Sequence, residues 1–205
     1  HSCCNCKSKS KKFLYKSKDN RITKNDNTFD IYQCINCQIV YCLPILSDEE
    51  LSQYYKSDQY YFTNNIHNLK SRKFEKYYKI IKDKYLNPNV LDFGCGDLKL
   101  LSYLRERNIN CHGYDNNKSI YNLNYYNFFK DNVLIGDIEK LGKIKNKFDV
   151  IILNQVIEHI QEPLKLFQIL SNIICDEGII IIETPNTNCI QFKLFRENAI
   201  HLDSP

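Results

Sequence analysis

Two pairs of cysteines near the start of the chain have the spacing of metal ligands. Cys3 and Cys6 form one C-x-x-C motif, Cys34 and Cys37 form a second, and 27 residues separate the two motifs. Each motif can present two thiolates to one ion from a tight turn, and two such turns complete a tetrahedral site of four sulfurs. Because four thiolates leave no open coordination position, we predict a structural zinc ion.

A bound metal would also supply stability that this part of the chain lacks. A segment of about 40 residues buries too little apolar surface to fold alone. The alternatives are disulfides or a thioredoxin-like redox pair, and no secretory leader is visible that would favour disulfides. Cys4 is an alternative to Cys3 as a ligand, although Cys4-x-Cys6 is a tighter turn than usual, and Cys42 is predicted to be a small buried residue.

Glycines and acids in the second half of the chain have the order of a nucleoside site. Gly94 and Gly96 follow an apolar stretch that ends in Asp92-Phe93, and such glycines let a ligand approach the backbone beside the next helix. Asp115, 21 residues after Gly94, can accept hydrogen bonds from both ribose hydroxyls. Asp137 is placed to accept from the exocyclic amine of a purine. Each acid alone is more often a helix N-cap or a solvated turn residue than a ligand.

Parallel strands must position these residues. From Asn89 onward, apolar strands and amphipathic helices alternate, which is typical of an α/β fold whose chemistry lies at the carboxyl ends of its strands. We predict helices over Leu98–Arg107 and Tyr121–Phe129, one from Pro163, and a turn at Asp176–Gly178. The predicted strands are Val90–Phe93, Cys111–Asp115, Val133–Asp137, Phe148–Leu153 and Ile179–Glu183. Since the last strand would leave an exposed edge, we expect two further strands or a partner to cover it.

The residues before this region indicate a connector of two helices. Ser47-Asp48-Glu49-Glu50 is a capping box that opens a short helix through Tyr55. A longer helix ends at Asn87-Pro88, with an apolar face formed by Phe74, Tyr77, Tyr78, Ile81 and Tyr85. We therefore predict a zinc-ribbon module over residues 1–45, a helical connector over 46–88 and a Rossmann-like domain over 89–205.

The glycine loop also indicates which cofactor is bound. The dinucleotide fingerprint requires a third glycine where Lys99 stands, which argues against NAD. Several segments instead resemble successive motifs of class I S-adenosylmethionine-dependent methyltransferases, over roughly residues 89–186. These segments are Val90–Gly96, Gly113–Asp115, Gly136–Asp137, Phe148–Ile151, Val156–Ile160, Glu162-Pro163 and Gly178–Pro185. The resemblance implies a Rossmann-like methyltransferase sheet with S-adenosylmethionine as cofactor.

A narrower resemblance extends toward the N-terminus. The cysteine ribbon is followed by Val40-Tyr41-x-x-Pro44, by Glu50-Leu51-x-x-Tyr54-Tyr55 and by Tyr60-Tyr61. This order resembles a group of zinc-ribbon methyltransferases often associated with sugar and surface-glycan modification. Members place a third glycine where Leu98 stands, and they continue beyond a segment like His201–Pro205 into a last pair of strands. We therefore expect further strands after Pro205.

The resemblance implies a role for each residue of the glycine loop. The backbone of Gly94, Cys95 and Gly96 would border the methionine part of the cofactor, with Asp92 orienting the loop. Asp115 would hold the ribose. Cys95 could also be read as a nucleophile, but no general base is evident beside it, and a small packed side chain is the alternative.

The resemblance further implies which residues meet the adenine and the methyl group. Asp137 with Ile138 would hold the adenine, and Asn154 with Gln155 would close over the transferring methyl. A general base is needed only for a weak nucleophile such as a hydroxyl. His159 is the candidate base, and the alternative is a histidine that packs its helix and bonds to backbone.

Composition excludes some functions and leaves others open. With 43% hydrophobic and 25% charged residues the chain is typical of a folded protein, and its longest aliphatic runs are far shorter than the roughly 18 residues of a membrane span. We expect a cytoplasmic location. Residues 1–30 hold eight basic and three acidic side chains, a surplus that could attract phosphate, although solvated lysines are the favoured explanation.

We therefore predict an S-adenosylmethionine-dependent methyltransferase that acts on a small molecule or a sugar. The first alternative is an RNA methyltransferase whose basic ribbon docks nucleic acid, which would bind RNA with a steep salt dependence. The second alternative is a non-catalytic binding or scaffold module. Titration with S-adenosylmethionine discriminates between these functions.

Overall fold

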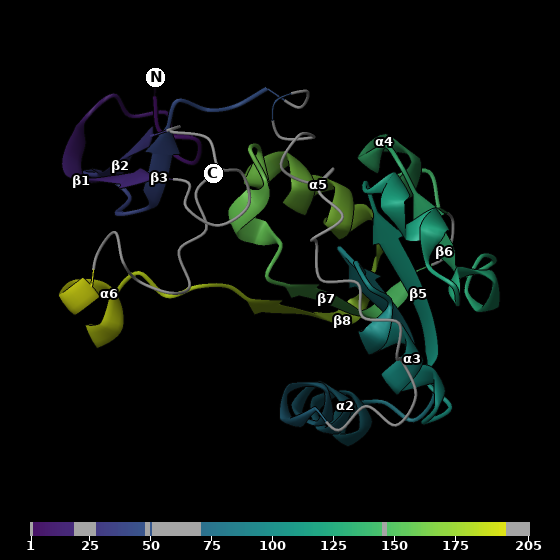
Figure 1. Ribbon diagram of the computed structural model, residues 1–205. Helices are drawn as coiled ribbons and strands as arrows, with labels where there is room; N and C mark the ends of the chain where they lie inside the picture. The colour runs from purple at the N-terminus through teal and green to yellow at the C-terminus, as the bar shows by residue number, and fades with distance from the viewer. Residues whose placement is uncertain (1, 19–27, 48–49, 51–70, 145–146, 196–205) are drawn as a thin grey trace. The chain divides into compact units, whose positions relative to one another are not determined.

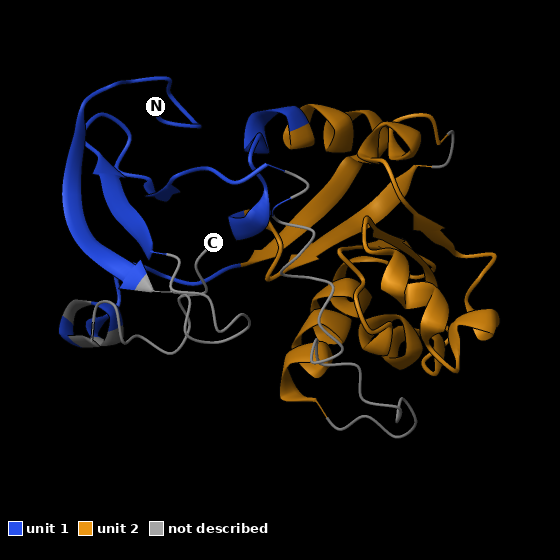
Figure 2. Ribbon diagram, turned by 45° about the horizontal axis from the view of Figure 1, so that its top comes forward, with its two compact units in different colours: residues 1–60, 158–165, 184–205 blue, residues 61–157, 166–183 orange. Residues whose placement is uncertain are grey.

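The computed structural model describes residues 2–18, 28–47, 50, 71–144 and 147–195 (Figure 1). Contacts divide the chain into two units, which are coloured in Figure 2. Unit 1 comprises residues 1–60, 158–165 and 184–205, and unit 2 comprises residues 61–157 and 166–183. The boundaries at 45/46 and 88/89 stay predictions. In the described part of the chain, no helix has the length and apolarity that a membrane span requires.

Unit 1 contains a three-stranded antiparallel sheet in the order β1-β2-β3. The strands are β1 (Lys11–Lys18), β2 (Thr28–Cys34) and β3 (Val40–Leu43). Alternation along β2 places Phe29 and Ile31 on one face, where they form a small buried cluster with Tyr15. Helix α6 (Ile190–Phe195) contributes to this cluster, since the ring of Phe192 lies 5.9 Å from that of Tyr15.

The predicted capping box at Ser47 forms. The backbone N–H of Ser47 donates to Oε2 of Glu50 at 2.7 Å, and the backbone N–H of Glu50 donates to Oγ of Ser47 at 3.3 Å. These reciprocal bonds satisfy two N–H groups at a helix start. The rest of the helix predicted through Tyr55, and the pair Tyr60-Tyr61, lie outside the described residues.

Unit 2 contains a five-stranded parallel sheet in the order β6-β5-β4-β7-β8 (Figure 1). The strands are β4 (Asn89–Phe93), β5 (Asn110–Asp115), β6 (Val133–Ile135), β7 (Phe148–Asn154) and β8 (Ile174–Glu183). The chain runs from β4 outward to β6 and then returns to the other side of β4 with β7. In open parallel sheets, ligands bind beyond the carboxyl ends of the strands at such a reversal, which here is at β4. The predicted Rossmann-like sheet is confirmed.

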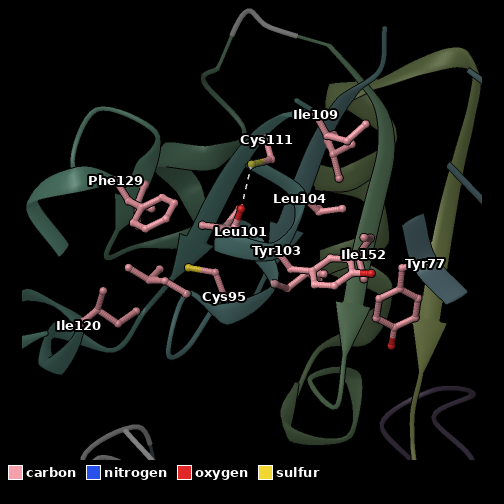
Figure 3. Close-up of a cluster of buried hydrophobic side chains, with 14 of the residues drawn as sticks. Tyr77, Cys95, Leu101, Tyr103, Leu104, Ile109, Cys111, Ile120, Phe129 and Ile152 are labelled. Carbon is pink, nitrogen blue, oxygen red and sulfur yellow. Dashed lines mark hydrogen bonds between the residues drawn. The ribbon is translucent and has the colours of Figure 1, made fainter. Parts of the chain in front are cut away.

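Helices cover both faces of this sheet. Figure 1 shows α2 (Arg72–Lys84) and α3 (Lys99–Arg105) on one face and α5 (Pro163–Ile173) on the other. Val90, Val150 and Ile152 point to the α2 and α3 side, where they join a large buried cluster that includes Tyr77 and Ile81 (Figure 3). Full burial of each such aliphatic side chain contributes about 1.5–3 kcal/mol to folding.

Three predicted elements differ in the structure. The helix expected over Tyr121–Phe129 is replaced by two 3-10 turns, Lys118–Asn122 and Tyr126–Phe128, since this segment is rich in asparagine and aromatic residues, which are weak helix formers. The third strand ends at Ile135 because Asp137 caps the short helix α4 (Ile138–Leu141).

The third difference is at the start of β8. The strand begins at Ile174, directly after α5, and includes the residues expected to form a turn. Its register against β7 shifts, with Phe148 opposite Ile174 and Val150 opposite Ile179, so the extra residues form an irregularity inside the strand. Among the described residues, no strand pairs with β8 on the side away from β7.

Candidate functional site

The loop after β4 is held in a conformation that requires glycine. Gly94 has φ +78°, and a Cβ atom there would lie 2.4 Å from Cγ2 of Val156. The backbone N–H of Gly94 donates to the carbonyl of Tyr114 at 2.7 Å, which ties the loop to the end of β5. A larger residue here would clash with the Val156 side chain, so the packing of the loop against the segment after β7 requires glycine.

Asp115 connects the loop to the second strand end. Its Oδ2 accepts from the backbone N–H of Gly96 at 2.8 Å, and its Oδ1 accepts from the backbone N–H of Asn117 at 2.8 Å. The side chain is 8% exposed, and this burial raises its pKa, while the two N–H donors act in the opposite direction. Each oxygen keeps a lone pair, so the carboxylate can accept two further hydrogen bonds in a fixed orientation.

Asp137 lies at the third strand end and caps a helix. Its Oδ1 accepts from the backbone N–H of Glu139 at 2.9 Å, as the N-cap of α4. The backbone N–H of Gly136 donates to the carbonyl of Asp115 at 2.9 Å, so the ends of β5 and β6 are joined. The capping alternative therefore applies to Asp137, and the roles of Asp137 and half-buried Ile138 toward an adenine stay predictions.

Asp92 is a buried carboxyl group inside β4. The residue is 3% exposed, and among the described residues the structure records no hydrogen-bond partner for its carboxyl. Burial, with smaller contributions from Asp115 and Asp97, raises the pKa of Asp92 to about 8. Asp92 is therefore protonated in the folded protein at neutral pH, which avoids an unpaired buried charge.

This raised pKa predicts a pH-dependent gain of stability in Asp92→Asn. Between pH 4 and pH 8 the folded chain keeps a proton that the unfolded chain releases, so the group lowers the free energy of unfolding as pH rises, by up to about 1.4 kcal/mol per unit. The melting temperature of the variant relative to wild type should rise from pH 5 to pH 8 and level above it. Asp83→Asn, on the exposed side of α2, is the control. A difference independent of pH would contradict the prediction.

Cys95 is a packed side chain in this structure. The residue is 5% exposed, and a Cβ atom on Gly113 would lie 2.8 Å from its Sγ, so the thiol fills the space beside that glycine. Burial raises the pKa of the Cys95 thiol well above its usual range. A buried neutral thiol is a poor nucleophile, so the structure favours the packing alternative.

Leu98 adopts the left-handed conformation at the start of α3. Its φ is +59°, a region that costs an L-residue about 1 kcal/mol or more and that glycine reaches freely. Its side chain is fully buried in the cluster between α3 and the sheet. The resembling proteins have glycine at this position because glycine adopts the left-handed conformation without strain. In this chain the burial of the Leu98 side chain offsets the strain.

Asn154, at the end of β7, belongs to a polar group that sequence analysis missed. Its Oδ1 accepts from Nζ of Lys73 at 2.8 Å, and the hydroxyl oxygen of Tyr77 lies 3.3 Å from it. Glu183, at the end of β8, accepts from Tyr77 at 2.9 Å and lies 3.0 Å from Nζ of Lys73. These four residues form one polar cluster. Neighbouring Gln155 is exposed and donates its backbone N–H to the carbonyl of Glu183 at 2.8 Å.

A sequence signal existed for parts of this cluster. Glu183 ends a predicted strand, as Asp115 does, and Lys73 is four residues before Tyr77 on a predicted helix. Tyr77 was assigned to the apolar face of that helix, and its ring is indeed buried, while its hydroxyl points away from the apolar cluster (Figure 3). Only the fold brings the three side chains together.

His159 is in a different unit from the glycine loop. It ends a 3-10 turn, Ile157–His159, and belongs to the 158–165 segment of unit 1, whereas Gly94 and Asp115 belong to unit 2. Its role as a general base stays a prediction.

The four predicted metal ligands come together in unit 1. The sulfurs of Cys3 and Cys37 are 3.5 Å apart, as are those of Cys6 and Cys34, and all four lie within 4.8 Å of one another. A tetrahedral zinc ion with bonds of about 2.3 Å requires sulfurs about 3.8 Å apart, so the cluster fits.

The two remaining cysteines of the ribbon lie outside this cluster. Cys4 is not among the grouped sulfurs, so the structure selects Cys3 over the alternative. Cys42 is half-buried and packs against the Tyr15 cluster of the sheet. Cys42 was predicted to be a small buried residue, and the structure shows it packed against apolar side chains but only half-buried.

Comparison with known families tests the assignment suggested by this geometry. A family profile described as a methyltransferase domain matches residues 62–204, more than half of the chain. The chain belongs to the methyltransferase-domain family. The resemblance noted for residues 89–186 is thereby confirmed, and the family match begins upstream of α2. A search of curated proteins returned no match.

Several solved methyltransferase structures are similar to parts of this chain. An S-adenosylmethionine-dependent methyltransferase from Archaeoglobus fulgidus is 26% identical, with 65% of this chain and 61% of that chain covered and a TM-score of 0.49. Coclaurine N-methyltransferase bound to N-methylheliamine and S-adenosylhomocysteine is 21% identical, with 55% and 34% covered and a TM-score of 0.46. The plantazolicin methyltransferase BpumL, with a pentazolic analogue and S-adenosylhomocysteine, is 19% identical, with 75% and 60% covered and a TM-score of 0.49. The chain spans less than two thirds of each.

Proposed function

We propose that this protein transfers a methyl group from S-adenosylmethionine to a small-molecule or sugar acceptor. The observation that carries the proposal is the Asp115 carboxylate, which is fixed by Gly96 and Asn117 at a strand end beside the glycine loop. A carboxylate with two fixed oxygens and two remaining lone pairs matches the two adjacent hydroxyls of a ribose. Membership of the methyltransferase-domain family supports this cofactor over a dinucleotide.

The residues present fit the other parts of such a cofactor. A Cβ atom on Gly96 would meet only the carbonyl oxygen of Gly94, at 4.0 Å, so the loop backbone at Gly96 is open to a ligand. We assign the backbone of Gly94, Cys95 and Gly96 to its methionine part. Asp137 and Ile138, beyond β6, are assigned to the adenine, because the bond from Gly136 to Asp115 joins their strand ends.

In this mechanism the protein positions the reactants. When bound, S-adenosylmethionine supplies an electrophilic methyl group on a sulfonium, which needs no further activation. Asn154 and Gln155, at the end of β7, are assigned to the place where the acceptor meets that methyl group. In-line alignment of two bound reactants contributes roughly 7–11 kcal/mol to the acceleration. For a hydroxyl acceptor, His159 is the assigned base that takes the proton from the acceptor oxygen.

We also propose that Cys3, Cys6, Cys34 and Cys37 hold a structural zinc ion. The sulfur spacing within 4.8 Å supports this assignment, as does the small size of the apolar cluster in unit 1. Four thiolate ligands leave the ion no position for a substrate, so its contribution would be to the stability of the ribbon.

Calorimetric titration with S-adenosylhomocysteine tests the proposed function. We expect one binding site with a micromolar Kd, followed by transfer of labelled methyl from S-adenosylmethionine to a sugar or sugar nucleotide. Transfer only to RNA would show that the acceptor is RNA and not a small molecule or sugar. Binding without transfer to any acceptor would favour a non-catalytic scaffold. Absence of binding to the folded protein would overturn the proposal.

A further inference from the structure

One face of the antiparallel sheet in unit 1 carries a row of aromatic side chains. Phe13, Tyr32 and Tyr41 lie on β1, β2 and β3, and the strand pairing places Tyr32 opposite both of the other two residues. The ring centroids of Phe13 and Tyr32 are 5.7 Å apart, and those of Tyr32 and Tyr41 are 6.3 Å apart. Because directly paired residues point to the same side of a sheet, the three rings form one row across the strands.

This aromatic row lies on the opposite face of the sheet from the buried cluster. Neighbouring residues of a strand point to opposite faces, and Tyr32 follows Ile31, which belongs to the buried cluster with Tyr15. Phe13 is 51% exposed, and Tyr32 and Tyr41 are half-buried. A group of partly exposed aromatic side chains on one sheet face is typical of a binding surface.

Two lysines lie on the face of the aromatic row. Nζ of Lys11 is 4.4 Å from the centroid of the Tyr32 ring, which is a cation–π contact. Nζ of Lys16 is 3.6 Å from Oδ1 of Asp30, and Asp30 shares the face of Tyr32 because it is two residues away on β2. The side chains of Lys16 and Asp30 are 61% and 38% exposed. An ion pair this exposed contributes little to stability, so an anionic ligand can compete for Lys16.

The charge of the ribbon favours an anionic partner. Residues 2–18 and 28–43 contain six lysines and one acid, Asp30, which gives a surplus of five positive charges. A zinc ion with four thiolates carries two net negative charges, so a surplus of three remains when the proposed metal is bound. Such a surface raises the local concentration of anions.

Aromatic rings flanked by cations are complementary to a single-stranded nucleic acid. An unstacked base can lie on an exposed ring, while lysines beside the ring pair with phosphates. A duplex keeps its bases stacked inside and would use only the lysines, as would an acidic peptide. A neutral sugar would use only the rings. Single-stranded nucleic acid is therefore the partner that uses both features of this face.

We propose that this face of the ribbon binds single-stranded nucleic acid. A base stacks on Phe13, the most exposed ring of the row, and Lys11 and Lys16 bind phosphates on either side of it along β1. Tyr32 is a positioning residue, since its ring meets that of Phe13 at 71° and holds it in place. The inference concerns unit 1 and needs no bound cofactor, so it goes beyond the proposed function and does not depend on it.

Fluorescence anisotropy of a labelled oligouridine of about 12 nucleotides, the length of one such site, tests the proposal. The wild type should bind it with an affinity that falls steeply with salt. Phe13→Ala should weaken binding by about 5- to 150-fold, the range for loss of one stacked base, and Phe13→Tyr should keep most of the affinity. Lys11→Gln should lower the slope of log K against log salt by about 0.7, the value for one phosphate of a single strand.

Phe128→Ala and Lys79→Gln are the matched controls. Phe128 is 72% exposed and Lys79 lies on α2, both in unit 2, so these variants should bind oligouridine like the wild type. A saturating concentration of S-adenosylhomocysteine should not displace the oligonucleotide.

Four results would overturn the inference. The first is absence of oligouridine binding by the wild type, and the second is equal binding of a duplex of the same length. The third is wild-type affinity in Phe13→Ala, or an unchanged salt slope in Lys11→Gln, with circular dichroism like that of the wild type. The fourth is displacement by S-adenosylhomocysteine, which would assign the nucleic acid to the cofactor site of unit 2.

Discussion

Cys34→Ser is expected to remove the bound metal and unfold the ribbon of unit 1, while the parallel sheet of unit 2 stays folded. Cys34 is fully buried, and its sulfur lies 3.5 Å from that of Cys6, so a serine there leaves three thiolates for a four-coordinate ion. Structural zinc supplies about 10–16 kcal/mol of binding free energy in small zinc-finger peptides, far more than the small core of unit 1 can replace. Metal analysis should show one zinc per wild-type chain and none in the variant.

Hydrogen exchange followed by mass spectrometry locates the effect. Amides of β1 and β2 should lose protection in Cys34→Ser, whereas those of β4 and β7 should keep it. Cys4→Ser is the control, because Cys4 lies in the same turn but outside the grouped sulfurs. The zinc assignment would be abandoned if Cys34→Ser kept both its metal and its protected β2 amides.

Asp115→Asn is expected to lower the affinity for S-adenosylhomocysteine by about 100-fold or more. The substitution keeps the shape of the side chain but removes the charge that two ribose hydroxyls would use, and each hydrogen bond to a charged group contributes about 1.5–3 kcal/mol. It also replaces one acceptor oxygen by a donor, so either Gly96 or Asn117 loses its partner. Calorimetric Kd values of the variant and the wild type measure the effect.

Two comparisons separate this loss from a general loss of structure. Asp176→Asn, at an exposed position in β8, should bind like the wild type. Adenine alone, which lacks the ribose, should lose little affinity for Asp115→Asn. Unchanged binding of S-adenosylhomocysteine by a folded Asp115→Asn would remove the central support of the proposed function.

Local patterns predicted the strands that carry the site. The apolar stretches that end at Phe93, Asp115 and Leu153 are strands in the structure, with boundaries that differ by one residue or less. The α/β alternation indicates a parallel sheet, whose strands all end at the same edge, which explains why the glycine loop and Asp115 could be placed together. The positions of the glycine loop and Asp115 could be predicted because each depends only on where its own strand ends.

Interactions between distant residues could not be predicted in this way. The bond between Tyr77 and Glu183 joins residues 106 positions apart, and no local pattern distinguishes Tyr77 from the other aromatic residues of its helix face. β8 begins at Ile174 because its register against β7 is irregular. The sequence Asp176–Gly178 is typical of a turn, so it gave no indication that the strand begins before it. The positive φ of Leu98 could not be predicted, because the burial of its side chain, which offsets the strain, is visible only in the structure.

The discontinuity of unit 1 has a consequence for synthesis of the chain. Translation delivers Tyr15 and Phe29 first, whereas Phe192, which lies against Tyr15, follows only after the whole of unit 2 has been made. Until Phe192 has been synthesised, the apolar face formed by Tyr15 and Phe29 lacks this aromatic partner while the chain is still on the ribosome. Exposed apolar surfaces of this kind attract chaperones. Early capture of an ion by the four thiols would then keep the nascent hairpin in register until the end of the chain arrives.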